Sequence, residues 1–363
     1  MQRRRFLVKA GGALVAAGVT AAVQAPNVIA QPKFQWRMAT SWPPSLDILQ
    51  GTAMRFGKMV TEMSGGRLRV DVYAAGELMP ALAVFDAVSK GSVEAFNSAP
   101  YYWAGKEPGM QWFSAVPFGL NAQGSYAWYH AGGGAAIMEE MYKAFDLVPR
   151  LAGSTGVQMG GWFRKRIDSL ADYKGLKMRI PGLGGKVVAK AGATVTLIAP
   201  GDVYTSLERG TIDATELVAP HDDLRQGYQR VARYYYYPGW HENGTTVEMT
   251  FHRKAYEALP VELQRIVDAA VGMTNTTMLA EYEMKNALGL QRLRAEFKDK
   301  VEVLRFPPEV MKELKRLAGE VNLEESERTP MGKKVFASYT KFQALIQDWG
   351  RISEAAYHSL VVG

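Results

Sequence analysis

Cysteine is absent from this 363-residue sequence, and histidine is scarce, with five residues scattered along the chain. The lack of thiols excludes disulfides, cysteine nucleophiles and thiolate metal sites. A chain of this length buries enough surface to fold without such cross-links. After the N-terminal segment no run reaches 18 apolar residues, so we expect no membrane-spanning helix in the mature chain. Any polar site is therefore expected to use oxygen and nitrogen donors.

The N-terminal segment 1–30 is typical of an export signal. Arginines at 3–5 and Lys9 precede a small apolar stretch over 10–23. The Arg-Arg-Arg-Phe-Leu start indicates the twin-arginine type, with a general secretory signal and a membrane anchor as alternatives. The segment holds four of the 43 basic residues and no acid, so cleavage lowers the net charge from +7 to +3. The charge thus gives no argument for a nucleic-acid partner, and the predicted location is the periplasm.

Apolar periodicity and turn residues predict alternating strands and helices, which is typical of an α/β fold with parallel strand pairs. The expected strands cover 34–40, 67–73, 93–97, 149–160, 176–180, 194–198, 211–218, 231–237 and 246–252. The expected helices cover 45–64, 80–90, 122–147, 184–191, 201–209, 260–297, 307–325 and 334–360.

No internal repeat, low-complexity tract or linker separates these segments, so we expect two lobes between which the chain crosses several times. Lobe I is predicted to span 31–157 and to be completed by about 250–325, and lobe II to span 158–249. The C-terminal helices, 326–363, are expected to pack across the lobes or in a dimer interface.

The stretch GLKMRIPGLGGKVVAKAG, residues 175–192, contains a glycine-rich turn that invites comparison with phosphate loops. A Walker loop ending at Gly185-Lys186 requires glycine at position 180 and Ser or Thr at 187, where this chain has Ile180 and Val187. A dinucleotide loop starting at Gly182 also fails at Val187. The glycines are therefore predicted to end a strand and to let a helix begin close to the lobe interface.

Arg179 lies in the same stretch, on a predicted strand whose other face carries Leu176, Met178 and Ile180. From periodicity alone, a solvent-facing strand surface is equally compatible. However, ligands of open α/β sheets bind at the carboxyl ends of strands. A guanidinium there offers a planar fork that matches a carboxylate.

Three motifs resemble a known family: KGLKMRIPG at 174–182, LERGTIDATE at 207–216 and YYYYPGW at 234–240. Together they are similar to the DctP-type periplasmic solute-binding proteins of TRAP transporters, in particular the branch that binds 2-oxo or 2-hydroxy monocarboxylates. The resemblance covers essentially the whole mature chain. It implies a two-lobed periplasmic binding protein fold with a cleft and long C-terminal helices. It also implies a non-enzymatic importer subunit that carries a small organic acid to a membrane permease.

The resemblance also implies roles for individual residues. Arg179 matches the arginine that makes a bidentate salt bridge to the ligand carboxylate. Gln158, Glu216, the backbone carbonyl of Leu217, and Glu242 match positions around a sodium or calcium ion that bridges protein and ligand. All four positions offer oxygen, the donor that hard cations prefer.

Two positions depart from the branch: Leu217 replaces a tryptophan and His221 replaces a tyrosine. Both changes are expected to alter the pocket, and the smaller side chain at 217 favours an acid bulkier than pyruvate. Further candidates for ligand contact are Tyr101 and Tyr102, after the predicted strand 93–97, and Trp42, after the first strand.

Two other functions remain open at this point. An exported enzyme acting on an organic acid needs a general base beside the arginine, and Glu216 or Glu242 supplies one. A sensor subunit that presents its ligand to a receptor needs the same cleft. The long C-terminal helices are also compatible with a homodimer.

Overall fold

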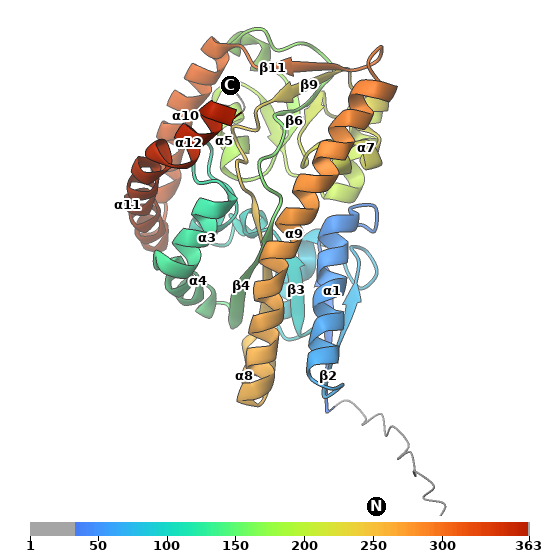
Figure 1. Cartoon of the computed structure of the whole chain (residues 1–363), viewed down its shortest axis with the longest axis vertical. Helices are drawn as coiled ribbons and strands as arrows, with labels where there is room; N and C mark the ends of the chain where they lie inside the picture. Colours follow the sequence, from blue (N-terminus) through green and yellow to red (C-terminus); the bar gives the residue numbers. More distant parts are fainter. Residues whose placement is uncertain (1–32, 362–363) are drawn as a thin grey trace, which may run out of the picture.

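The computed structural model describes residues 33–361 and shows two lobes, each built on its own β-sheet (Figure 1). The predicted export signal lies outside the described residues. The sheet of lobe I has the order β2-β1-β3-β10-β4, with β1 Phe34–Thr40, β2 Leu68–Tyr73, β3 Ala95–Ser98, β4 Leu147–Ser154 and β10 Thr246–His252. The sheet of lobe II has the order β11-β9-β5-β8-β6-β7, with β5 Gly161–Phe163, β6 Lys177–Arg179, β7 Thr194–Thr196, β8 Ala214–Thr215, β9 Tyr234–Tyr237 and β11 Glu302–Arg305.

Both sheets combine parallel and antiparallel pairs. In lobe I, β1 pairs parallel with β2 and β3, while β10 runs antiparallel between β3 and β4. In lobe II, β6 pairs parallel with β7 and β8, and β5 runs antiparallel to β8 and β9. The predicted two-lobed α/β fold is confirmed. The parallel pairs place their carboxyl ends, and the loops that follow them, at one edge of each sheet.

Helices cover the sheets and join the lobes. They are α1 Asp47–Met63, α2 Val84–Ser89, α3 Ala122–Ala131, α4 Gly134–Lys143, α5 Gly182–Lys190, α6 Val203–Glu208, α7 Pro220–Gln226, α8 Arg253–Glu257, α9 Val261–Glu296, α10 Pro308–Ser326, α11 Pro330–Ile352 and α12 Glu354–Val361. Figure 1 shows α9 running along both lobes, and it packs on α1 and β4 of lobe I and on α7 of lobe II.

The chain crosses between the lobes three times, as the sequence predicted. Segments 155–160 and 238–245 connect the two sheets, and α9 carries the chain from lobe I back to β11. The lobe boundaries proposed from the sequence stay predictions; β10, which begins at Thr246, belongs to the sheet of lobe I.

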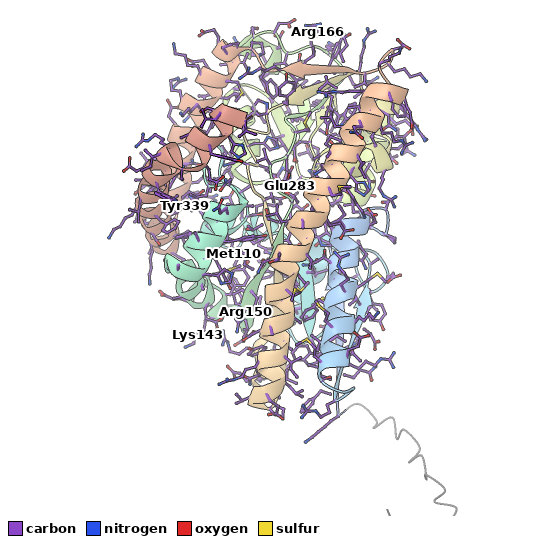
Figure 2. All side chains as sticks on the ribbon, viewed as in Figure 1. Met110, Lys143, Arg150, Arg166, Glu283 and Tyr339 are labelled. Atoms are coloured by element: carbon purple, nitrogen blue, oxygen red, sulfur yellow. The ribbon has the colours of Figure 1, made fainter. Side chains whose placement is uncertain are left out.

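The C-terminal helices pack on the outside of this frame. Tyr339 of α11, labelled in Figure 2, packs edge-on against Trp128 of α3. Its hydroxyl accepts a 2.8 Å hydrogen bond from the backbone N–H of Leu120. The helix α10 contacts α5 of lobe II, and α11 contacts α3 and α4 of lobe I. Thus α10 packs on lobe II and α11 on lobe I, and the expectation that 326–363 pack across the lobes or in a dimer interface stays a prediction.

Several predicted strands are shorter than expected, and two of them matter for the site. The run 149–160 ends at Ser154 and resumes as β5 at Gly161, and the run 211–218 keeps only β8. Gly153, with φ +142°, has no room for a side chain, because a Cβ there would lie 2.3 Å from the sulfur of Met278 on α9. The residues that leave the strands, among them Gln158, form loops between the lobes.

Candidate functional site

A small cavity lies between the two lobes. Its walls combine residues of lobe I, residues of lobe II and residues of the crossing segments. The lining consists of Trp42, Leu49, Tyr101, Tyr102, Thr155, Gln158, Arg179, Leu217, Val218, Thr245 and Val247. Six of the seven substrate-site residues predicted from the sequence belong to this lining, and Glu242 does not.

Arg179 is the last residue of β6, and its guanidinium is buried, with 1% exposure. One terminal nitrogen donates to Oε1 of Glu216 at 2.6 Å and to the backbone oxygen of the same residue at 2.9 Å. Nε donates to the carbonyl of Ile198 at 3.2 Å, and the other terminal nitrogen lies 3.4 Å from the hydroxyl of Tyr102. Burial opposes the charged form, but Glu216 and the neighbouring tyrosines together raise the pKa of Arg179, so the guanidinium stays protonated. The alternative of a solvent-facing strand surface does not hold.

Glu216 follows β8 and holds two site groups at once. Its Oε1 pairs with Arg179, and its Oε2 lies 3.3 Å from Nε2 of His241. Burial raises the pKa of Glu216 to about 7, with Arg179 working in the opposite direction. Burial lowers the pKa of His241 to about 4, so its ring is neutral at physiological pH.

Glu242 and Gln158 carry buried oxygens without partners. Oε2 of Glu242 accepts from the hydroxyl of Thr245, while its Oε1 has no hydrogen-bond partner. The amide nitrogen of Gln158 donates to Thr155 at 3.1 Å and to Thr245 at 3.2 Å, which leaves its Oε1 unpaired as well. Burial, and then the charge of Glu216, raise the pKa of Glu242 to about 8. Unpaired buried oxygens are rare in folded proteins and indicate a missing partner.

These residues fit a hard cation. Glu216, His241 and Glu242 bring potential ligand atoms within 4.8 Å of one another, and all three residues are buried. With Gln158, the set supplies carboxylate and amide oxygens, as sodium and calcium require. Burial raises the pKa of Glu216 and of Glu242, and a cation beside them would favour their ionised, ligating forms.

Aromatic side chains from lobe I close the other side of the cavity. The indole N–H of Trp42 donates to Oδ1 of Asn97 at 2.6 Å, which fixes the ring after β1. Tyr102 packs against Trp42 at 6.3 Å and against Tyr101 at 4.8 Å between ring centroids. Burial raises the pKa of Tyr102 to about 12, so its hydroxyl keeps its proton and can donate to an anion.

The glycines after Arg179 act by close packing. A Cβ on Gly185 would lie 2.5 Å from the carbonyl of Ile180, and one on Gly184 would lie 2.8 Å from Cβ of His241. The helix α5 can therefore begin directly beside the cation-binding candidates, as the sequence predicted. Replacing either glycine is expected to push this helix away from the cavity.

The structure places His221 differently from the prediction. This side chain is absent from the cavity lining and instead contacts Asp47, at the outer junction of α1, α7 and α9. The expectation that His221 alters the pocket is therefore wrong, because the helix α7 turns its first residues away from the cavity. Leu217 does line the cavity.

The sequence analysis missed His241 and five residues of the lining: Leu49, Thr155, Val218, Thr245 and Val247. Thr155 and Thr245 lie in the crossing segments and orient Gln158, and no local motif marks them. No role was predicted for His241. Its adjacency to Glu242 was the available signal.

Comparisons with known proteins agree with this geometry. The family model for bacterial extracellular solute-binding proteins of family 7 matches residues 38–328. A monocarboxylate 2-oxoacid-binding periplasmic protein of Nostoc sp. is 40% identical over 362 residues, which cover 99% of this chain and 98% of that protein.

Two solved structures are similar over nearly their full length. A TRAP transporter solute-binding protein of Bordetella bronchiseptica, a dimer with copurified calcium and picolinate in its active site, is 40% identical with a TM-score of 0.89, covering 92% of this chain and 98% of that chain. A TRAP periplasmic solute-binding protein of Pseudoalteromonas atlantica, with bound sodium and pyruvate, is 39% identical with a TM-score of 0.87, covering 90% and 98%.

Within residues 33–361, no helix combines the length and apolar character needed to cross a membrane. The match over most of the chain, the 40% identity and the shared two-lobed fold lead to one assignment. The chain belongs to the bacterial extracellular solute-binding proteins of family 7 and is the solute-binding component of a TRAP transporter.

Proposed function

We propose that this protein captures a small 2-oxo or 2-hydroxy monocarboxylate in the periplasm, between Arg179 and a cation held by Gln158, Glu216, Glu242 and the carbonyl of Leu217. One observation carries the proposal. A buried guanidinium shares its cavity wall with Gln158, whose Oε1 is unpaired, and Oε1 of the nearby Glu242 is unpaired too. A 2-oxo acid supplies what both sides lack: a carboxylate for the arginine, and two neighbouring oxygens that can chelate one cation.

Charge favours calcium over sodium as that cation. A bound cation favours the ionised form of both acids, so the ligand, Glu216 and Glu242 then bring three negative charges to a buried site, and Arg179 brings one positive charge. A divalent ion makes the formal charges cancel, whereas a monovalent ion leaves one negative charge unbalanced. Relatives have been solved with either ion.

The remaining wall of the cavity limits the tail of the ligand. Leu49, Leu217, Val218 and Val247 are apolar, and Arg179 is the one cationic side chain in the lining. A second carboxylate would be buried here without a partner. We therefore expect an uncharged aliphatic tail and rejection of dicarboxylates such as 2-oxoglutarate.

The same geometry supports transport rather than catalysis. Glu216, one of the two bases available to a hydrolytic or isomerising enzyme, is already paired with Arg179 and next to His241. Unchanged ligand should then be delivered to the membrane permease of the TRAP system. A turnover assay on 2-oxo acids is expected to show no product, and product formation would favour the enzyme.

Isothermal titration calorimetry tests the proposal. Protein stripped of metal by chelation is titrated with pyruvate, 3-methyl-2-oxobutanoate and 2-oxoglutarate, with and without added calcium or sodium. We expect binding of the monocarboxylates that strengthens at least about tenfold with calcium, and no binding of 2-oxoglutarate. Equal affinity with and without every cation would refute the cation bridge. Binding of a sugar or peptide alone would refute the ligand class.

A homodimer is a second proposal, based on α11 and α12. Leu345, Trp349 and Ile352 on α11 are 61–75% exposed, and Leu360 on α12 is 85% exposed. Isolated exposed apolar residues are common, but a series of large ones along two consecutive helices favours burial against a partner. We propose that a second copy of this chain covers them. Sedimentation should give a dimer that Trp349→Glu converts to a monomer, and a monomeric wild type would contradict this.

A further inference from the structure

Asp47 joins three parts of the molecule at a point outside the ligand cavity. It is the first residue of α1 in lobe I, yet its carboxylate contacts helices beyond that lobe. Oδ1 lies 2.8 Å from Nε2 of His221 and 3.2 Å from Nε of Arg225, both on α7 of lobe II. Oδ2 lies 3.1 Å from Nζ of Lys285 on α9.

Two further hydrogen bonds connect Ser45, which lies two residues before Asp47, to α7. The backbone oxygen of Ser45 accepts from Nε of Arg225 at 3.0 Å, and the hydroxyl of Ser45 accepts from the amide of Gln226 at 3.0 Å. The group formed by Ser45, Asp47, His221, Arg225, Gln226 and Lys285 is called the Asp47 junction below.

The Asp47 junction is connected to the cavity on both of its sides. In lobe I, Trp42 and Leu49 line the cavity and flank the junction residues in sequence. In lobe II, Leu217 and Val218 line the cavity and directly precede α7. A movement that separates the cavity walls therefore also pulls the junction apart.

The electrostatics of the junction favour contact. Burial tends to raise the pKa of Asp47, but hydrogen bonds from His221 and Lys285, together with the charge of Arg225, lower it. The side chains keep 18–43% exposure. Each such pair is weak alone, whereas several that meet on one carboxylate add up.

We propose that the Asp47 junction is a latch that biases the protein toward the closed arrangement of its lobes, and that Asp47 is a positioning residue for ligand retention. Asp47 touches no ligand in this scheme. It acts because ligand release requires the lobes to separate, which costs the contacts of the junction. The proposal depends on the proposed function only for the choice of pyruvate as the probe.

Stopped-flow tryptophan fluorescence with pyruvate and calcium tests the latch. Asp47→Asn keeps the size of the side chain and removes its charge. We expect the dissociation rate to rise roughly fivefold to tenfold, with the association rate changed less than about twofold. Lys285→Gln, which acts from the other helix, is expected to have a smaller effect in the same direction.

The matched control is Glu94→Gln, because Glu94 forms an ion pair with Arg37 at 3.3 Å entirely within lobe I. This variant should dissociate pyruvate at the wild-type rate. Equal dissociation rates for wild type and Asp47→Asn, in a variant with wild-type melting temperature, would overturn the latch.

Small-angle X-ray scattering of ligand-free protein separates failure of the latch from failure of the proposed ligand. Asp47→Asn is expected to have a larger radius of gyration than wild type and Glu94→Gln. If wild type binds no 2-oxo acid, the proposed function fails. The scattering comparison alone then tests whether the latch exists. Identical curves for all three proteins would then contradict it.

Discussion

Glu242 and Glu248 are two buried glutamates only six positions apart, and they differ in one respect. Burial raises the pKa of both, to about 8 for Glu242 and about 7 for Glu248. Glu248 accepts from the indole of Trp103 at 2.8 Å and from the hydroxyl of Thr250 at 2.6 Å, one bond to each oxygen. Glu242 has one oxygen without a partner. Glu248, with both oxygens satisfied, supports the fold, whereas the free oxygen of Glu242, close to the unpaired oxygen of Gln158, is available to a ligand.

The largest expected effect concerns Arg179, the positively charged side chain that lies beside the acids of the cavity. Arg179→Ala should weaken pyruvate binding in calcium by more than about 3 kcal/mol, which is over a hundredfold in Kd, because a desolvated carboxylate loses its charged partner. Arg179→Lys keeps the charge without the planar fork, so its affinity for pyruvate should lie between those of wild type and Arg179→Ala. Calorimetry showing wild-type affinity for Arg179→Ala would remove this residue from the site.

A smaller effect separates the two glutamates directly. Glu242→Gln removes a negative oxygen from the proposed cation site and should lower calcium affinity about tenfold to a hundredfold. Glu248→Gln is the matched control and should leave calcium affinity unchanged, since its carboxyl faces Trp103 and Thr250. Direct calcium titration distinguishes the variants. Equal losses in both would erase the contrast between the glutamates.

Glu248 should instead control stability as a function of pH. Its native pKa, about 7, lies above the ordinary 4.5, so the native state favours the protonated form. Its stabilising contribution is complete below pH 4.5 and is lost as pH rises through 7. The amide of Glu248→Gln resembles the protonated acid. At pH 8 the free energy of unfolding of the variant should therefore exceed that of wild type by on the order of 1–2 kcal/mol.

Urea unfolding at pH 5 and pH 8 measures this difference. Glu283→Gln on the exposed surface of α9, labelled in Figure 2, is the control and should match wild type at both values. Identical curves for Glu248→Gln and wild type at pH 8 would show that Glu248 ionises without cost.

The smallest effect concerns Leu217, one of the apolar residues of the cavity wall. Leu217→Trp should favour pyruvate over 3-methyl-2-oxobutanoate by about tenfold relative to wild type, because the indole fills space near the tail. The carbonyl of residue 217 is unaffected, so calcium binding should persist. An unchanged ratio of the two affinities would place the tail elsewhere.

Much of the fold was predictable from local patterns. The strand 34–40 and the helices near 45–64, 260–297 and 307–325 appear as β1, α1, α9 and α10, with small differences at their ends. Their apolar periodicity reflects one buried face, which neighbouring residues determine. The predicted strands 149–160 and 211–218 were too long, because their ends leave the sheets and form isolated hydrogen bonds between loops, such as that from the N–H of Met159 to the carbonyl of Val218.

The site was predictable only in part. Arg179 was selected from its place on a predicted strand as well as by resemblance, and Gln158, Glu216 and Glu242 by resemblance alone. The structure brings the four together in one buried cluster. Thr245 and His241 escaped notice since their roles depend on partners distant in sequence. His221 was expected in the pocket because it replaces a tyrosine of the resembled branch, but α7 directs it to Asp47, 174 positions away.

The sequence alone determined the family, the alternation of strands and helices, and the oxygen-rich chemistry of a cysteine-free site. The family follows from the three motifs that resemble it, and the other two properties follow from residue type and short-range periodicity. The tertiary structure decided which acids have unpaired oxygens, which side chains are buried, and where the lobes touch. Burial and pairing arise when segments far apart in the chain pack together, and only then do a charge and its environment set a pKa or a binding site.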